Sequence, residues 1–251
     1  LKAAGFIAIG RTNMTEFAFS GVGVNPHYGT PKNVWDRATA RVPGGSTSGG
    51  AIALTDGMAH GSLGTDAGGS CRIPAAFNGL VGYKPPYGRN PDDPPFNLDF
   101  YCHTGPLART VEDAIILQNV MAGPHPLDIA TLRPKLTLPT AFKPIKGWKI
   151  AFSMDLGFYR VDREVQKNTL AALEVFRSLG AEVHEVKLGW TEEALDASMN
   201  YLDHLFGASV SRLLKEHGSK LTTYARAFAK KGQKSKAVEF VRSGAQLYRK
   251  V

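Results

Sequence analysis

Two segments rich in glycine and serine hold the residues of this chain that are best suited to chemistry. Residues 43–50 read PGGSTSGG, and residues 64–75 read GTDAGGSCRIPA. In the second segment Ser70 follows Gly68 and Gly69, which lack a Cβ, so consecutive backbone N–H groups there can turn toward one point. Such donors can stabilise an oxyanion, and a serine beside them is placed for nucleophilic attack. The pattern therefore favours a nucleophilic serine beside an oxyanion hole.

The sequence lacks the motifs of several other kinds of site, which bind nucleotide phosphates, dinucleotides or catalytic zinc or carry the nucleophilic serine of α/β-hydrolases. The sequence has no Gly-Lys dipeptide for a P-loop, no Gly-x-Gly-x-x-Gly that opens a helix after a strand, no Gly-x-Ser-x-Gly and no His-Glu-x-x-His. A serine hydroxyl is a weak nucleophile and needs a base within reach. None of the seven histidines lies in a motif that suggests pairing with Ser70. The local pattern thus leaves the base unassigned.

The elements that must position these segments are short. Eleven glycines fall within residues 44–82, and because glycine costs conformational entropy on folding, this concentration marks a site rather than a scaffold. Residues 51–54 suit a short buried helix between the two segments. Residues 5–10, an apolar run bounded by glycines, predict a short buried strand.

Further along, a proline-rich loop covers residues 84–96, and Thr110 is expected to cap a helix that ends before Gly123. The apolar stripe of that helix comprises Val111, Ala114, Ile115 and Val120. Prolines at positions 134, 139 and 144 mark a connector that could act as a hinge between subdomains.

The second half of the sequence predicts a strand, a helix, another strand and then a helical tail. Strands are expected over residues 149–152 and 181–188, the helix between them ends at Gly180, and residues 192–251 are mostly helical by pattern. The apolar face of the intervening helix comprises Val165, Thr169, Ala172, Leu173 and Phe176. This order predicts an α/β fold with parallel pairing.

The composition is that of a globular protein: 251 residues, 43% hydrophobic and 21% charged. The sequence contains no window of 18 or more apolar residues, so no segment is expected to span a bilayer. The two cysteines, Cys71 and Cys102, form no Cys-x-x-Cys and argue against a disulfide scaffold and against a zinc site, so a reducing cytoplasm is expected. No metal or cofactor is expected. Without an initiator Met or a signal peptide, the chain is expected to begin inside a longer protein.

The net charge of +8 is concentrated in one segment. Residues 212–251 contain 11 Lys and Arg against 2 Glu, a balance of +9, and residues 1–211 balance to −1. A basic segment can bind a polyanion. No nucleic-acid motif accompanies it, so a solvated helical surface is favoured and nucleic acid is not expected as a partner.

Together these residues resemble the amidase signature family. The resemblance rests on the two glycine-serine segments, on residues 10–17 (GRTNMTEF), on residues 77–85 (FNGLVGYKP) and on residues 105–113 (GPLARTVED). It is good over about residues 1–128 and looser to about residue 188. It implies a single α/β domain over residues 1–251, with a mixed β-sheet core flanked by helices and incomplete at both ends. Residues 1–130 would form the signature core and residues 145–251 a looser α/β and helical portion.

The resemblance also implies a Ser–cisSer–Lys triad. Ser70 matches the nucleophile, and Ser46 matches the bridging serine whose preceding peptide bond is cis. The backbone of residues 67–70, which comprises Ala67, Gly68, Gly69 and Ser70, matches the oxyanion hole. Supporting positions are Ser48, Thr65, Asp66 and Arg72, of which Asp66 and Arg72 match positions that brace the loop. From the residues themselves, Thr65 and Asp66 are expected to be structural, and Arg72 is expected to be an ion-pair partner.

One part of the family pattern is missing. The family's catalytic lysine lies farther upstream than the 45 residues that precede Ser46, while Arg11 and Lys84 match positions that are not catalytic. The resemblance therefore implies a fragment with little or no activity of its own.

Three functions remain open on the sequence alone. The first is a cofactor-free amidase that hydrolyses a small-molecule amide through a serine acyl-enzyme. The second is the amidotransferase A subunit for charged tRNA, from which the segment of residues 84–106 departs, so that a free amidase is favoured. The third is a non-catalytic paralogue. The substrate and the oligomeric state are not encoded in a readable pattern.

Overall fold

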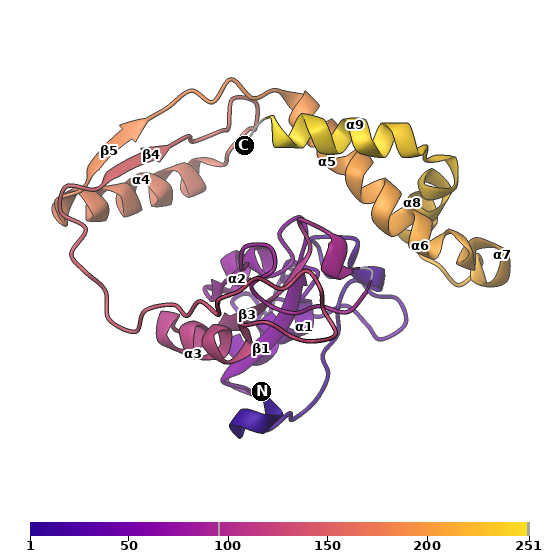
Figure 1. Cartoon of the computed structure of the whole chain (residues 1–251), viewed down its shortest axis with the longest axis horizontal. Coiled ribbons are helices and arrows are strands. Elements are labelled where there is room, and N and C mark those ends of the chain that lie inside the picture. The colour runs from indigo at the N-terminus through magenta and orange to yellow at the C-terminus, as the bar shows by residue number, and fades with distance from the viewer. Residues whose placement is uncertain (95, 250–251) are drawn as a thin grey trace. The chain divides into compact units, whose positions relative to one another are not determined.

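The computed structural model describes residues 1–94 and 96–249, and they form two compact units (Figure 1). The units are Leu1–Thr140 and Ala141–Val251. Their boundary falls in the proline-containing connector. One residue of the predicted proline-rich loop, Pro95, lies outside the described residues.

The first unit is built around a three-stranded antiparallel sheet in the order β1–β3–β2. Its strands are β1 (Gly61–Asp66), β2 (Val81–Gly82) and β3 (His103–Ala108), and its helices are α1 (Ser48–Thr55), α2 (Arg72–Asn78) and α3 (Val111–Met121). Short 3₁₀ turns cover Lys2–Ala4, Glu16–Ala18 and Phe96–Leu98. The register pairs Gly61 with Ala108 and Asp66 with His103, so the end of β1 lies beside the start of β3.

One buried cluster in the core of this unit lies between α1, α2 and β3. Its buried side chains, each at most 2% exposed, are Ala51, Leu54, Cys71, Ala75 and Leu107. The short buried helix predicted for residues 51–54 is confirmed and lies within α1. Since Cys71 directly follows Ser70, the core fixes one end of the loop that carries Ser70.

Helix α3 begins where the sequence predicts. Thr110 caps it, and its Oγ1 accepts a hydrogen bond of 3.1 Å from the backbone N–H of Asp113. Ala114 and Ile115 are buried as expected, but Val111 is 46% exposed and does not belong to the buried stripe.

The strand predicted over residues 5–10 is wrong. This segment has no regular secondary structure beyond the turn that ends at Gly5, and Ile7 and Ile9 are 85% and 72% exposed. A strand needs a neighbouring backbone to satisfy its N–H and C=O groups, and no other described segment pairs with this one. The apolar run alone is therefore not sufficient for a strand.

The second unit contains the predicted strand–helix–strand motif. Strand β4 (Lys149–Phe152) pairs in parallel with β5 (Glu182–Glu185), and α4 (Arg163–Ser178) connects them. Asp162 caps α4 by accepting a hydrogen bond of 2.8 Å from the N–H of Glu164. The α/β class is confirmed, with the strands of the described residues arranged as two small sheets, one antiparallel and one parallel.

The remainder of the second unit is helical, as predicted for residues 192–249; positions 250 and 251 of that prediction lie outside the described residues. Its elements are α5 (Glu192–Leu202), a π-helical turn (Asp203–Gly207), α6 (Ala208–Ser211), α7 (Leu213–His217), α8 (Thr223–Lys234) and α9 (Ala237–Tyr248). Tyr201 stacks on Phe240 at 4.9 Å and so joins α5 to α9. No helix in the described part of the chain combines the length and apolar character needed to cross a membrane.

Candidate active site

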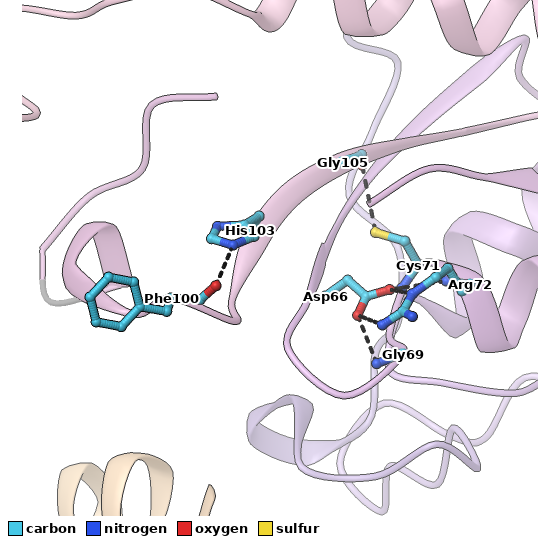
Figure 2. A network of polar contacts seen from close by, with 7 residues as sticks. All are labelled: Asp66, Gly69, Cys71, Arg72, Phe100, His103 and Gly105. Atoms are coloured by element: carbon cyan, nitrogen blue, oxygen red, sulfur yellow. Dashed lines mark hydrogen bonds and ion pairs between the residues drawn. The ribbon is translucent and has the colours of Figure 1, made fainter. Parts of the chain in front are cut away.

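The loop that carries Ser70 connects β1 to α2 and is organised by one carboxylate (Figure 2). Asp66, at the end of β1, is 0% exposed. It accepts hydrogen bonds from the backbone N–H groups of Gly69 (2.7 Å), Cys71 (3.1 Å) and Arg72 (3.3 Å). Because these donors surround position 70 in the chain, a single side chain sets the path of the loop.

Arg72 completes this arrangement with its side chain. Its Nε lies 2.9 Å from Oδ2 of Asp66 and its Nη2 lies 2.8 Å from Oδ1, which is a bidentate ion pair. Burial by itself would raise the pKa of Asp66, but the hydrogen bonds and charge of Arg72 and the backbone N–H groups outweigh it and lower the pKa. The carboxylate is therefore charged at neutral pH, and Arg72 is an ion-pair partner, as predicted from the sequence.

Gly69 adopts a conformation that few other residues could. Its φ of +128° lies outside the range that L side chains favour, and a Cβ there would come within 2.6 Å of the Ile73 side chain. The Ile73 N–H donates to the Gly69 carbonyl oxygen at 2.6 Å, so the loop turns directly into α2.

The N–H groups of this loop are not equivalent. That of Gly69 is donated to Asp66, which differs from the expectation that it faces an oxyanion. The N–H groups of Ala67, Gly68 and Ser70 have no hydrogen-bond acceptor within residues 1–94 and 96–249. The structure thus uses Gly69 to shape the loop and leaves the other three donors available.

Ser46 lies in the other glycine-serine segment and is only 2% exposed. The peptide bond between Gly45 and Ser46 is cis, as the resemblance implied for this position. The Ser46 carbonyl oxygen accepts three hydrogen bonds, from the N–H of Thr15 (3.3 Å), the N–H of Ser48 (2.9 Å) and the hydroxyl of Ser48 (3.2 Å). Ser48, at 0% exposure, therefore supports Ser46 directly.

One peptide unit joins the two glycine-serine segments. The Ser46–Thr47 peptide presents its carbonyl oxygen to Thr15 and Ser48, and its N–H donates to the Ser70 carbonyl oxygen at 3.3 Å. Two serines that are 24 positions apart in sequence (70 − 46) are thereby held against each other through main-chain atoms.

Among the candidate supporting residues, Thr65 stands apart from this network. It lies on β1 opposite Thr104, its side chain is exposed, and no hydrogen bond in the described structure joins it to the other candidates. Thr65 therefore contributes to the site only through its backbone position in β1.

Two residues that contact the serine segments, Thr15 and Asn13, are not revealed by the motifs alone. The Asn13 carbonyl oxygen accepts the N–H of Gly49 at 2.8 Å, and Thr15 binds Ser46 as described above. Both residues lie in the GRTNMTEF segment, which contributed to the resemblance, but nothing in its spacing indicates contact with residues 46–49. No three-residue group of His, Cys, Asp or Glu in the described chain is arranged to hold a metal ion.

Three ionisable groups near Asp66 are perturbed by burial. Desolvation raises the pKa of the Cys71 thiol and lowers the pKa of Lys84. It also lowers the pKa of His103, which pairs with Asp66 across the sheet and whose Nε2 lies 2.9 Å from the Phe100 carbonyl oxygen (Figure 2). A carbonyl can only accept, so Nε2 of His103 carries the proton.

The chain is similar to known proteins of one family. The model of the Amidase family matches residues 1–249. Among curated proteins, the chain is 42% identical over 193 residues to the A subunit of glutamyl-tRNA(Gln) amidotransferase from Streptococcus pneumoniae (strain Hungary19A-6), covering 74% of this chain and 38% of that protein. The corresponding protein from Cupriavidus taiwanensis is 36% identical over 211 residues, covering 76% and 41%.

Solved structures show the same relationship. A bacterial aryl acylamidase of the amidase signature family has a TM-score of 0.84 and 30% identity, covering 93% of this chain and 50% of that one. A structure described as an amidase has a TM-score of 0.83 and 30% identity, covering 99% and 54%. The chain thus spans about two fifths to one half of the length of these relatives. Because the family model matches nearly the whole length of this chain, the chain belongs to the amidase signature family.

Proposed function

We propose that this chain carries the serine pair and the oxyanion donors of an amidohydrolase that acts on a small-molecule carboxylic amide. The main support is the single peptide unit that fixes Ser46 against the Ser70 segment. A proton relay between two hydroxyls requires them to be held within hydrogen-bond reach, and main-chain hydrogen bonds are a direct way to do this.

In the proposed reaction, Ser70 Oγ attacks the amide carbonyl carbon and its proton passes to Ser46. The negative charge that develops on the carbonyl oxygen is stabilised by the N–H groups of Ala67, Gly68 and Ser70. Collapse of the tetrahedral intermediate breaks the C–N bond, and the leaving amine takes a proton through Ser46. Water then adds to the acyl-enzyme and releases the carboxylic acid and Ser70.

The base that accepts the proton from Ser46 is, in this proposal, a lysine that precedes Leu1 in the longer protein. Lys84 is half-buried, and the charge of Asp66 acts on it. Its position matches one that is not catalytic in the family, so it is not assigned this role. The cytoplasmic location expected from the cysteine content belongs to the same proposal.

The test is covalent labelling with a fluorophosphonate, read by intact mass, on the chain with and without its natural upstream sequence. We expect one adduct on the extended chain, none on its Ser70→Ala variant and little on the 251-residue chain. An extended chain that is not labelled at Ser70 would refute the proposed nucleophile. Equal labelling of the shorter chain would refute the upstream lysine, and Lys84→Met would then be the next variant.

The relatives support a second candidate, an A subunit that works within a tRNA-dependent amidotransferase. The observation in its favour is the 42% identity to such a protein from Streptococcus pneumoniae. The segment of residues 84–106, which departs from the usual run of those proteins, favours the free amidase. Hydrolysis of a small amide by the purified extended chain alone would support the amidase, whereas activity only with partner proteins and charged tRNA would support the second candidate.

A further inference from the structure

A buried polar residue outside the serine segments contacts Ser46. Thr15 is 2% exposed and precedes the 3₁₀ turn of Glu16–Ala18. Its backbone N–H donates to the Ser46 carbonyl oxygen at 3.3 Å. The first contact between this segment and Ser46 is therefore made by the main chain of Thr15.

The hydroxyl of Thr15 closes the loop that follows it. Oγ1 donates to the Ser20 carbonyl oxygen at 3.0 Å and accepts from the buried N–H of Gly23 at 3.1 Å. Between Thr15 and Ser20, the residues Phe17 and Ala18 have φ values of +53° and +62°, which non-glycine residues rarely adopt. The loop is thus kept in a conformation that its own residues do not prefer, and the Thr15 hydroxyl links its two ends.

The closed loop is the surface on which Gly45 rests. A Cβ on Gly45 would lie 2.6 Å from the Ser20 carbonyl oxygen, 2.8 Å from Thr15 Oγ1 and 2.9 Å from the Gly23 nitrogen. These three groups are the Thr15 hydroxyl and the two backbone groups that it joins. A change in the closure of the loop therefore acts directly on the Gly45–Ser46 peptide.

We propose that Thr15 is a positioning residue for Ser46, acting through this closed loop and through its own N–H, and touching neither substrate nor the reacting atoms. This inference rests on the proposed function, because it assigns a purpose to the orientation of Ser46. Displacing a relay group by a fraction of its hydrogen-bond length slows the reaction while leaving substrate binding largely intact.

The experiment compares Thr15→Val with Thr15→Ser in the chain that carries its natural upstream sequence. Valine keeps the shape and the backbone N–H but loses the hydroxyl, whereas serine keeps both hydrogen-bonding groups. The readouts are the rate of fluorophosphonate labelling at Ser70, and kcat and KM for a neutral aryl amide. We expect Thr15→Val to lower the labelling rate and kcat by about 10- to 100-fold with KM changed less than about threefold, and Thr15→Ser to restore both rates.

A matched control separates positioning from loss of stability. Thr110→Val removes the hydroxyl that caps α3, which is also a contact between a threonine hydroxyl and a backbone N–H of the same unit, but one away from the serines. It should lower the melting temperature while kcat and the labelling rate stay unchanged. If Thr15→Val does not fold, Thr15→Cys, whose thiol is a weaker donor, should give an intermediate loss of kcat.

The outcomes are distinct. If Thr15→Val behaves like the Thr110→Val control, with a lower melting temperature and an unchanged kcat, the positioning role is refuted while the proposed function stands. If the unsubstituted extended chain is not labelled at Ser70, the proposed function fails and the positioning role fails with it.

Discussion

The Asp66 carboxylate offers a quantitative test of how the loop of Ser70 is built. Its two oxygens accept five hydrogen bonds, three from backbone N–H groups and two from Arg72. In Asp66→Asn one oxygen becomes an NH₂ group, and whichever way the amide is turned it faces N–H donors. Breaking a buried ion pair from one side costs about 3–5 kcal/mol. The Arg72 side chain is 53% exposed and can recover hydration, so we expect the low end, about 3 kcal/mol.

The measurement is equilibrium denaturant unfolding together with thermal unfolding. About 3 kcal/mol corresponds to a fall in melting temperature of roughly 6–12 °C in a chain of this size. Arg72→Lys is the control, because it keeps a positive charge and all the backbone donors and should cost about 1 kcal/mol or less. In the chain that carries its natural upstream sequence, Asp66→Asn should also make Ser70 lose its reactivity toward a fluorophosphonate, since the path of its loop is no longer set.

The pH dependence follows from the same carboxylate. The pKa of Asp66 is lower in the folded chain than the ordinary value of about 3.9. Its contribution to stability is therefore complete above the unfolded pKa and is lost as the pH falls through the folded-state pKa. The Asn variant should lack this acid-dependent loss. An Asn variant within about 0.5 kcal/mol of the unsubstituted chain, or one with the same acid dependence, would refute the reasoning.

Three further predictions concern neighbouring groups. Gly45→Ala should lower the free energy of unfolding by about 1–3 kcal/mol, and abolish labelling at Ser70 in the chain with its natural upstream sequence, because its Cβ meets three backbone and side-chain atoms. Gly10→Ala, where a Cβ meets nothing within 4 Å, should be neutral by thermal unfolding. Burial raises the pKa of Cys102 to about 12 and also raises that of Cys71, so neither thiol should react with iodoacetamide at neutral pH until the chain unfolds; rapid alkylation of the native chain would contradict this. Burial lowers the pKa of His103, so the midpoint of its titration by NMR should lie below the ordinary value of about 6.5. The stability that the neutral imidazole contributes should be lost as the pH drops from that value to the folded-state pKa.

The sequence predicts those parts of the fold that local patterns encode. The cap at Thr110, the short helix within α1 and the parallel pairing of β4 with β5 all follow from patterns that span fewer than about 40 residues. The strand expected over residues 5–10 fails because an apolar run indicates burial but does not supply a neighbouring strand.

The residues of the candidate site are predicted by motif resemblance and not by local secondary-structure patterns. The motif resemblance selects Ser46, Ser70, Asp66 and Arg72. In the structure a main-chain hydrogen bond joins the two serine segments, and Arg72 pairs with Asp66. The resemblance gives no indication that Asp66 uses the N–H of Gly69, or that Thr15 reaches Ser46 across 31 positions (46 − 15). Such contacts depend on the packing of loops without periodicity, so no spacing rule can reveal them.

The link between the Ser46–Thr47 peptide and Ser70 has a consequence for how this site can change during evolution. Since both partners are main-chain atoms, replacing a side chain removes neither the donor nor the acceptor, apart from a proline at position 47, which has no N–H to donate. A change in chain length that shifts α1 against β1 would break the link. The turn around Gly57, where a Cβ would meet nothing within 4 Å, is the point at which inserted residues could bulge into solvent without shifting either element. We therefore expect lineages of this protein to vary in length at that turn and to keep a constant number of residues within α1 and within β1.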